Sequence, residues 1–442
     1  MIAWLAIVLA ALASVLVWPV VARVTAARLT FVTVTAGFGY WYWIPSINIL
    51  AGGYLGEEPV IPDPVVALDA VWVVMVYQLV ALLVLCALVP ALDRKVKVVQ
   101  SVPPALPVNY MAPMVFAAAV ALFAWYFADK GIVILVQVLI GATSPRELSD
   151  FENFSTSVWD SLRSLLEVSV LFSALFLIAH AALTRRLATV ATGLAFAAIA
   201  LVFLGTGTRA TMLMALVVIL IAIASGQRVA PRQASGGRLV LALLMGAMLL
   251  LPIVMAISAR QAIGTGQTDP VLALLVVNND MFRELVFVMS QMQSYQSDGG
   301  LAFVSTPFIF VTPRFLGFSR ELPDHVLAYN MARAGIDLIL GSGNVFPGIV
   351  ADFRLAYGPG GPFAFGAFIG SFALALAQLN RFQARGVAMV AAQCATAAFL
   401  FFSFRNIHPG LVLVLIVSAV GLWLLGRLEP LLHARLPDAR RA

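Results

Sequence analysis

The stretch VVALDAVWVVMVYQLVALLVLCALVP occupies residues 65–90 and contains one charged side chain, Asp69, near its beginning. A transmembrane helix needs about 20 consecutive, predominantly apolar residues, and this run exceeds that length. Its apolar residues follow one another without the alternation of polar and apolar positions that marks a strand of an outer-membrane barrel. The run therefore predicts a helix that spans a lipid bilayer.

The composition of the whole chain agrees with this interpretation. Of 442 residues, 62% are hydrophobic and 11% are charged, and the mean hydropathy is +0.98. Soluble domains are about 45–50% apolar and about 25% charged. The composition therefore predicts a polytopic membrane protein and excludes a soluble enzyme and a nucleic-acid-binding protein. The two cysteines, Cys86 and Cys394, lie in apolar runs and are too few for a disulfide scaffold.

Eleven segments are long and apolar enough, or nearly so, to cross a bilayer. They are residues 2–22, 31–50, 65–90, 109–128, 165–183, 187–204, 210–225, 239–257, 361–379, 387–404 and 410–426. We predict an all-α fold with about 11 transmembrane helices (about 10 to 12) in a single membrane domain over residues 1–442. The first segment has neither a basic n-region nor a small-residue cleavage site, so we interpret it as a retained span.

The charges between these segments predict the orientation of the chain. One alternating set of loops and tails holds sixteen Lys and Arg residues and three acidic residues, whereas the other set holds eleven and eighteen. The positive-inside rule assigns the first set to the cytoplasm. This assignment places the N-terminus outside and the C-terminus in the cytoplasm, and it puts the long region 258–360 outside.

The external region 258–360 is the predicted location of the chemistry, because functional residues concentrate on loops that a rigid scaffold holds. Its sequence predicts short helices rather than disorder. Residues 281–295 place apolar side chains on one helical face after good N-cap residues, and Pro323-Asp324 can begin a second helix through about Arg333. A third helix is expected between Pro347, in its first turn, and Gly358, at its C-cap.

Arginines at the outer ends of several predicted helices are the candidate ligands for a phosphate-bearing substrate. The planar guanidinium matches phosphate oxygens with two parallel hydrogen bonds. The candidates are Arg209, Arg260, Arg314, Arg320, Arg333, Arg354 and Arg405. The competing interpretation is that each one serves as a salt-bridge partner or headgroup anchor, since arginine outnumbers lysine throughout this chain.

Three external residues are candidates for acid–base catalysis: His325, Asp352 and His408. An imidazole or a carboxylate can take the proton from an acceptor hydroxyl group. The alternative for each histidine is a polar surface residue. The sequence predicts no metal site, because it has no Asp-x-Asp and no converging set of oxygen ligands, and it predicts no cofactor, because it has no P-loop and no G-x-G-x-x-G unit.

An external site has no access to cytosolic nucleotides, so its activated substrate must arrive through the membrane. Sugars linked to a polyprenyl diphosphate satisfy this condition, because the lipid lies in the bilayer and the diphosphate at its surface. The diphosphate is the leaving group of glycosyl transfer. Arginines can stabilise the charge that develops on it, as a metal ion would otherwise do.

Two segments resemble motifs of the bacterial O-antigen and oligosaccharide repeat-unit polymerases (the Wzy family). The stretch LGTGTRA, residues 204–210, resembles that family's turn of small residues followed by arginine. The stretch GNVFPGIVADFRLAYGPGG, residues 343–361, resembles the pattern that closes the family's large external loop. The number of predicted spans and the single long external region are also similar to that family.

This resemblance implies a metal-independent polymerase with the architecture of membrane glycosyltransferases (GT-C-like). It would join oligosaccharide repeat units linked to undecaprenyl diphosphate at the external face of the bacterial inner membrane, in O-antigen, capsule or exopolysaccharide biosynthesis. The implied partners are the lipid bilayer, the lipid-linked glycans, a chain-length regulator and a flippase.

Three alternatives remain open at this point. An O-antigen ligase would use the same donor but transfer the glycan to lipid A–core, and Arg320, His325 and His408 suit it equally. A polysaccharide transporter or flippase is the second alternative, although such proteins often contain internal repeats and the ionisable residues here gather at the outer face. The third is a non-catalytic assembly scaffold.

Overall fold

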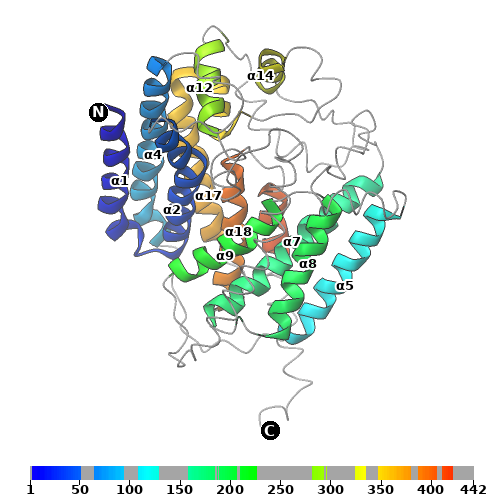
Figure 1. Ribbon diagram of the computed structural model, residues 1–442. Helices are drawn as coiled ribbons and strands as arrows, with labels where there is room; N and C mark the ends of the chain where they lie inside the picture. The colour runs from blue at the N-terminus through cyan, green and yellow to red at the C-terminus, as the bar shows by residue number, and fades with distance from the viewer. Residues whose placement is uncertain are drawn as a thin grey trace.

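The computed structural model of the chain describes residues 2–50, 64–93, 108–128, 158–184, 187, 189–206, 210–225, 281–292, 295, 324–334, 347–379, 387–405 and 411–421. All regular secondary structure within these ranges is helical (Figure 1). Four of the described helical segments are long and apolar enough to cross a membrane: Ala3–Val21, Val65–Leu92, Leu165–Leu183 and Ile349–Gln378. The prediction of an all-α membrane fold is confirmed at this level.

Helices lie over each predicted span except residues 239–257, which fall outside the described residues. They are α1 (Ile2–Val21), the continuous run α2 (Thr25–Phe38), η1 (Gly39–Trp43) and α3 (Ile44–Leu50), then α4 (Pro64–Asp93), α5 (Val108–Phe127), α7 (Val158–Leu183), α8 (Val190–Thr206), α9 (Ala210–Ala224), α17 (Gly361–Gln378), α18 (Val387–Ser403) and the helix Leu411–Gly421. The π-helical turn η1 inside the second predicted span was not expected from the sequence.

Helix α1 shows how the chain meets its apolar surroundings. Leu5, Val8, Val15 and Leu16 of this helix are each more than half exposed. Its small residues, such as Ala6 and Ala10, are instead fully buried against the rest of the bundle. A face of large apolar side chains next to a face of small ones is what a helix at the lipid boundary of a bundle requires.

Helices α4 and α17 pack side by side through glycines. A Cβ atom on Gly366 would lie 2.9 Å from Val80, and one on Gly370 would lie 2.9 Å from Leu88 and from Val84. Small residues at this spacing let two helices approach closely inside a membrane. Residue numbers increase in the same direction along both helices, so α4 and α17 run parallel, as the predicted topology requires.

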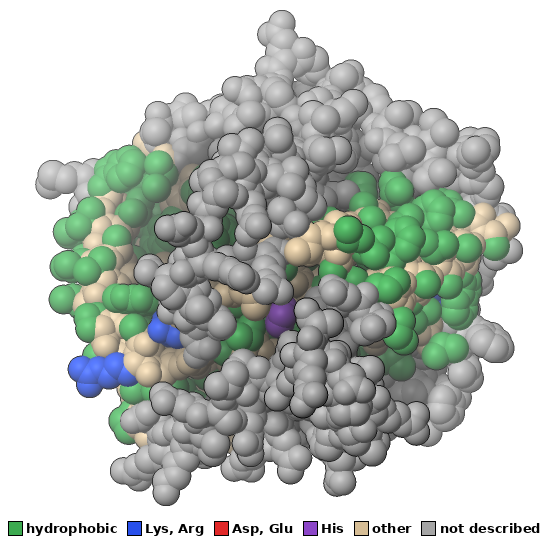
Figure 2. All heavy atoms as spheres, turned by 90° about the horizontal axis from the view of Figure 1, so that it is seen from below, with side chains coloured by type: hydrophobic (Ala, Val, Ile, Leu, Met, Phe, Trp, Pro, Cys, Tyr) green, Lys and Arg blue, Asp and Glu red, His purple; other side chains and the backbone are tan. Residues whose placement is uncertain are grey.

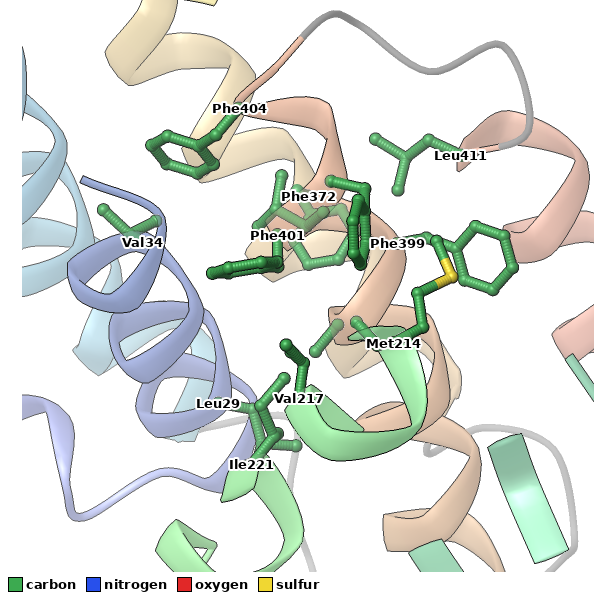
Figure 3. Close-up of a cluster of buried hydrophobic side chains, with 14 of the residues drawn as sticks. Leu29, Val34, Met214, Val217, Ile221, Phe372, Phe399, Phe401, Phe404 and Leu411 are labelled. Atoms are coloured by element: carbon green, nitrogen blue, oxygen red, sulfur yellow. The ribbon is translucent and has the colours of Figure 1, made fainter. Parts of the chain in front are cut away.

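Helix α18 occupies the centre of the described bundle, where it packs against α2, α7 and α9. Nearly all of its side chains are buried. Figure 3 shows Phe399 and Phe401 of α18 in one cluster with Leu29 of α2 and with Val217 and Ile221 of α9. The turn that follows α18 begins at Phe404, whose side chain is also buried in the bundle.

The short helices of the predicted external region lie at one end of the bundle. These are α12 (Met281–Gln291), α14 (Asp324–Ala334) and α16 (Ile349–Tyr357), which leads through the 3-10 turn η5 (Gly358–Gly360) into α17. Helices α12 and α14 lie at the same end as the N-terminus of α1 (Figure 1). Gly361, the first residue of α17, contacts Tyr77 of α4. From Tyr77 to its first residue, Pro64, α4 extends for about another 20 Å, since an α-helix rises 1.5 Å per residue.

The opposite end of the molecule carries basic side chains. Figure 2 looks at this end and shows Lys or Arg side chains at one edge, with no acidic side chain in view among the described residues. Arg23, in the turn between α1 and α2, is exposed, and Arg28 donates a hydrogen bond to the carbonyl of Ala22 at 3.5 Å. This distribution agrees with the charge asymmetry on which the predicted orientation is based.

Candidate functional site

Helix α16 is the element that positions the site, and a glycine precedes and follows it. Gly348 has φ of +88° and Gly358 has φ of +54°, values that side chains with a Cβ atom rarely adopt. Gly358 therefore ends the helix as the sequence predicts. The prediction that Pro347 lies in the first turn of this helix is wrong. Gly348 is not helical, and α16 begins at Ile349, two residues after Pro347.

The N-terminus of α16 is joined to two distant parts of the chain. The N–H of Ile349 donates to the carbonyl of Phe404 at 3.2 Å. The N–H of Val350 donates to the hydroxyl of Tyr42 at 3.0 Å, and that hydroxyl donates to the carbonyl of Phe404 at 3.4 Å. Helix α16 is thus fixed to the end of α18 and to the π turn η1 at a single point.

The imidazole of His325 in α14 and the carboxylate of Asp352 in α16 face each other. Nε2 of His325 lies 3.5 Å from Oδ1 of Asp352, and the two side chains are 1% and 3% exposed. Asp352 stays in place because its own N–H donates to the carbonyl of Gly348 at 2.8 Å. Burying a polar or charged group is costly unless a partner compensates it, and His325 is the partner that faces Asp352.

Helix α14 is held in turn by α12. The hydroxyl of Tyr329 in α14 donates a short hydrogen bond to the carboxylate of Glu284 in α12, and the Tyr329 ring contacts Phe287 edge-on, with centroids 5.9 Å apart. The helix predicted from Asp324 is confirmed, and the helix predicted over 281–295 is confirmed from Met281 to Gln291, so that it ends before Met292 and Tyr295. The buried residues of α12 include Met281 and Leu285, which the sequence placed on its apolar face.

Two of the predicted arginines belong to the described segments that surround the start of α16. Arg354 is half-buried in the last turn of α16 and is close enough to Tyr77 of α4 to interact with it electrostatically. Arg405 follows Phe404 directly and lies beside Tyr40. Arg405 is exposed, yet the surrounding protein desolvates its guanidinium and lowers the pKa of that group. The guanidinium of Arg405 is therefore accessible to water on one side and enclosed by protein on the other.

The remaining predicted residues are not placed relative to the pair. The backbone of Arg333 belongs to α14. The others lie outside the described residues: Arg209, Arg260, Arg314, Arg320 and His408. The structure thus brings together His325 and Asp352, and the bonds to the Phe404 carbonyl connect Arg405 to the start of α16.

The sequence alone did not indicate Tyr42 or Tyr40. They belong to the run GYWYW of residues 39–43, which forms η1. Aromatic residues in a predicted span are ordinarily interpreted as anchors at the membrane surface. The only available signal was the density of aromatic residues, because no spacing rule predicts a π turn.

A second polar cluster lies where α5 and α7 meet. The hydroxyl of Tyr126 donates to Oε2 of Glu167 at 3.4 Å, and the guanidinium of Arg163 lies 5.1 Å from the centroid of the Tyr126 ring. A Cβ atom on Gly205, in the turn predicted to precede Arg209, would lie 3.1 Å from that ring. The cluster therefore packs against the segment that carries the first of the two family-like motifs.

Among the residues that the structure describes, no three His, Cys, Asp or Glu side chains come together as a metal site would require. Comparisons with protein-family models, with curated proteins and with solved structures return no match.

Proposed function

We propose that this protein is a membrane glycosyltransferase that joins oligosaccharide repeat units linked to undecaprenyl diphosphate at the external face of the bacterial inner membrane. The observation that carries the proposal is the buried pair of His325 and Asp352, held by the helices of the predicted external region. The resemblance of residues 204–210 and 343–361 to repeat-unit polymerases supports it further.

The pair suits general-base catalysis. Asp352 faces Nε2 of His325, and the imidazole of His325 would take the proton from the acceptor hydroxyl. Asp352 would orient the ring and stabilise the imidazolium that forms, as carboxylates do for catalytic histidines. The acceptor oxygen then forms a bond to the anomeric carbon of the donor, and the bond from that carbon to the diphosphate breaks. The diphosphate leaves with the electron pair.

Arg405 and Arg354 are the described residues suited to that leaving group. The charge on the diphosphate grows as the glycosidic bond breaks, and guanidinium groups fixed in advance stabilise it without rearrangement. The backbone that leads into Arg405 is restrained, because the preceding carbonyl, that of Phe404, accepts two hydrogen bonds. The polyprenyl tail of the donor stays in the bilayer, which brings its diphosphate to the level where the spans end.

The proposal includes the predicted topology of about 11 spans. Residues 258–360 would be external, the N-terminus external and the C-terminus cytoplasmic. The parallel course of α4 and α17 and the basic side chains at the opposite end of the bundle support this arrangement.

The deciding experiment is reconstitution of the purified protein with lipid-linked repeat units. We expect products of increasing length that remain attached to the lipid, and none when Asp352 and His325 are both replaced by leucine. Transfer of glycan to added lipid A–core, without polymer, would instead identify a ligase. Movement of the substrate across the membrane without any new glycosidic bond would identify a transporter and contradict the proposal.

A further inference from the structure

We infer that Tyr42 is a positioning residue for the pair of His325 and Asp352, acting as the N-terminal cap of α16 from a different part of the chain. The inference rests on the proposed function for the catalytic role of that pair. Tyr42 belongs to η1, far from α16 in sequence, and its hydroxyl hydrogen-bonds to the first turn of α16.

The first N–H groups of any helix have no partner within the helix, and a side-chain oxygen of the N-cap residue usually accepts from one of them. The N-cap residue of α16 is Gly348, which has no side chain. The hydroxyl of Tyr42 replaces the missing side-chain oxygen, because it accepts a hydrogen bond from the N–H of Val350 at 3.0 Å. The carbonyl of Phe404 accepts from the N–H of Ile349.

The approach of Gly348 to Tyr42 shows that the contact is built into the backbone. A Cβ atom at residue 348 would lie 2.9 Å from the Tyr42 hydroxyl and 3.1 Å from Met281 of α12. Glycine therefore meets two needs at this position, a positive φ and room for the hydroxyl. The Tyr42 side chain itself is fully buried, and its ring contacts Phe38 with centroids 5.9 Å apart.

The π turn explains how Tyr42 can reach α16. A π turn inserts an extra residue into an α-helix and changes the direction in which the following side chains point, and such turns are frequent at functional sites. Trp41 and Tyr42 consequently face α18 together. The indole N–H of Trp41 donates to the carbonyl of Phe401 at 3.1 Å, while the hydroxyl of Tyr42 reaches both α16 and Phe404.

Only two residues separate Val350, which Tyr42 holds, from Asp352. The Tyr42 hydroxyl and the Asp352 carboxylate are also close enough to interact electrostatically. If the first turn of α16 loses its cap, Asp352 moves relative to His325. Displacements on the order of 1 Å near a reacting group can cost about 100-fold in rate.

The test compares Tyr42→Phe with Trp41→Phe in the purified full-length protein. Tyr42→Phe removes the two buried hydrogen bonds of the Tyr42 hydroxyl, one to Val350 of α16 and one to the carbonyl of Phe404. Trp41→Phe removes one buried bond, to the carbonyl of Phe401, and none to α16. We expect Tyr42→Phe to lower kcat about 10-fold or more while KM for the lipid-linked donor changes less than about 2-fold, because the base and not the binding site is displaced. Trp41→Phe should retain kcat within about 3-fold. Equal losses of kcat in the two variants would overturn the inference.

A second readout separates this inference from the proposed function. In protein labelled with 15N-histidine, the imidazole signals of His325 are assigned by their loss in His325→Gln. Tyr42→Phe should move these signals and Trp41→Phe should leave them in place, whether or not glycans are polymerised. Moved signals without any polymerase activity would support the positioning role and contradict the function. Unmoved signals together with wild-type kcat in Tyr42→Phe would contradict the positioning role alone.

Discussion

Nε2 of His325 lies 3.5 Å from Oδ1 of Asp352, and both side chains are almost completely buried. His325 belongs to the short helix α14 and Asp352 to the short helix α16, both within the predicted external region 258–360. Each of these helices is anchored separately. Helix α14 is bound to α12 through Tyr329 and Glu284, whereas α16 is bound to η1 and α18. The pair therefore depends on tertiary contacts from several directions.

Removing one partner of the pair should destabilise the protein and abolish activity. His325→Ala or Asp352→Ala leaves the other group buried without compensation, which costs about 3–5 kcal/mol for buried ion pairs. The loss of a general base or its orienting group should lower the rate by about 100-fold or more. Thermal unfolding in detergent and the polymerisation assay measure the two effects.

The double variant His325→Leu with Asp352→Leu separates these effects. Two apolar side chains of similar volume can replace a buried ion pair with little loss of stability. We expect a melting temperature near that of the wild type and no polymer. Thr396→Val serves as the matched control, because it removes a buried hydrogen bond to Ser418 that involves neither α14 nor α16, and its kcat should remain within about 3-fold of wild type. Polymerase activity in the double leucine variant would show that the pair is structural.

Gly348→Ala should destabilise the protein by about 2–4 kcal/mol, because a Cβ atom meets the Tyr42 hydroxyl and a positive φ is strained for alanine. Gly358→Ala has the same backbone problem, with φ of +54°, but nothing within 4 Å of the new atom, and should cost about 1 kcal/mol. Gly193→Ala, in α8, has neither problem. The melting temperature should be lowest for Gly348→Ala, higher for Gly358→Ala and highest for Gly193→Ala. Equal values for the Gly348 and Gly193 variants would be inconsistent with the packed geometry.

Arg405→Lys should be nearly as harmful as Arg405→Ala. A guanidinium supplies two parallel donors to a diphosphate and an ammonium supplies one point charge, so losing the contact should cost about 2–4 kcal/mol in the transition state. Rates at saturating lipid-linked donor measure this loss. Arg23, exposed at the opposite end of the bundle, is the control, and both of its substitutions should be tolerated. Full activity of Arg405→Lys would rule out a bidentate contact at this position.

Gly366→Leu and Gly370→Leu should disrupt the packing of α17 on α4. A Cβ atom alone would already lie 2.9 Å from Val80 or Leu88, and overpacking of this kind costs about 1–3 kcal/mol or more. Gly421→Leu, where nothing lies within 4 Å, should be tolerated. The yield of monodisperse protein after detergent extraction reports the difference. Comparable yields for all three variants would argue against close contact of these helices.

The predicted topology can be tested with reporter fusions after Gln233 and after Gln267. The charge asymmetry of the loops places the first position in the cytoplasm and the second outside. A phosphatase reporter, active only outside, should be silent at Gln233 and active at Gln267. If both positions report the same side, the span at residues 239–257 does not cross the membrane.

The sequence by itself determined the solvent in which this chain folds and the positions of its long helices. Runs such as residues 65–90 have no apolar partner large enough in a soluble fold, so burial in lipid follows from composition alone. The short helices α12 and α14 were also predictable, because N-cap residues and apolar periodicity are local properties of the chain. Gly358 was predictable as a helix end for the same reason.

Only the tertiary structure decided which of the candidate residues meet. His325 and Asp352 were two of three candidates for acid–base catalysis, and nothing in the sequence paired them, since a distance between α14 and α16 is not encoded in either helix. The role of Tyr42 was equally inaccessible, because it depends on a π turn and on a glycine without a side chain at residue 348. Hydrogen bonds between segments hundreds of residues apart arise from packing, and packing is a property of the whole bundle rather than of any stretch within it.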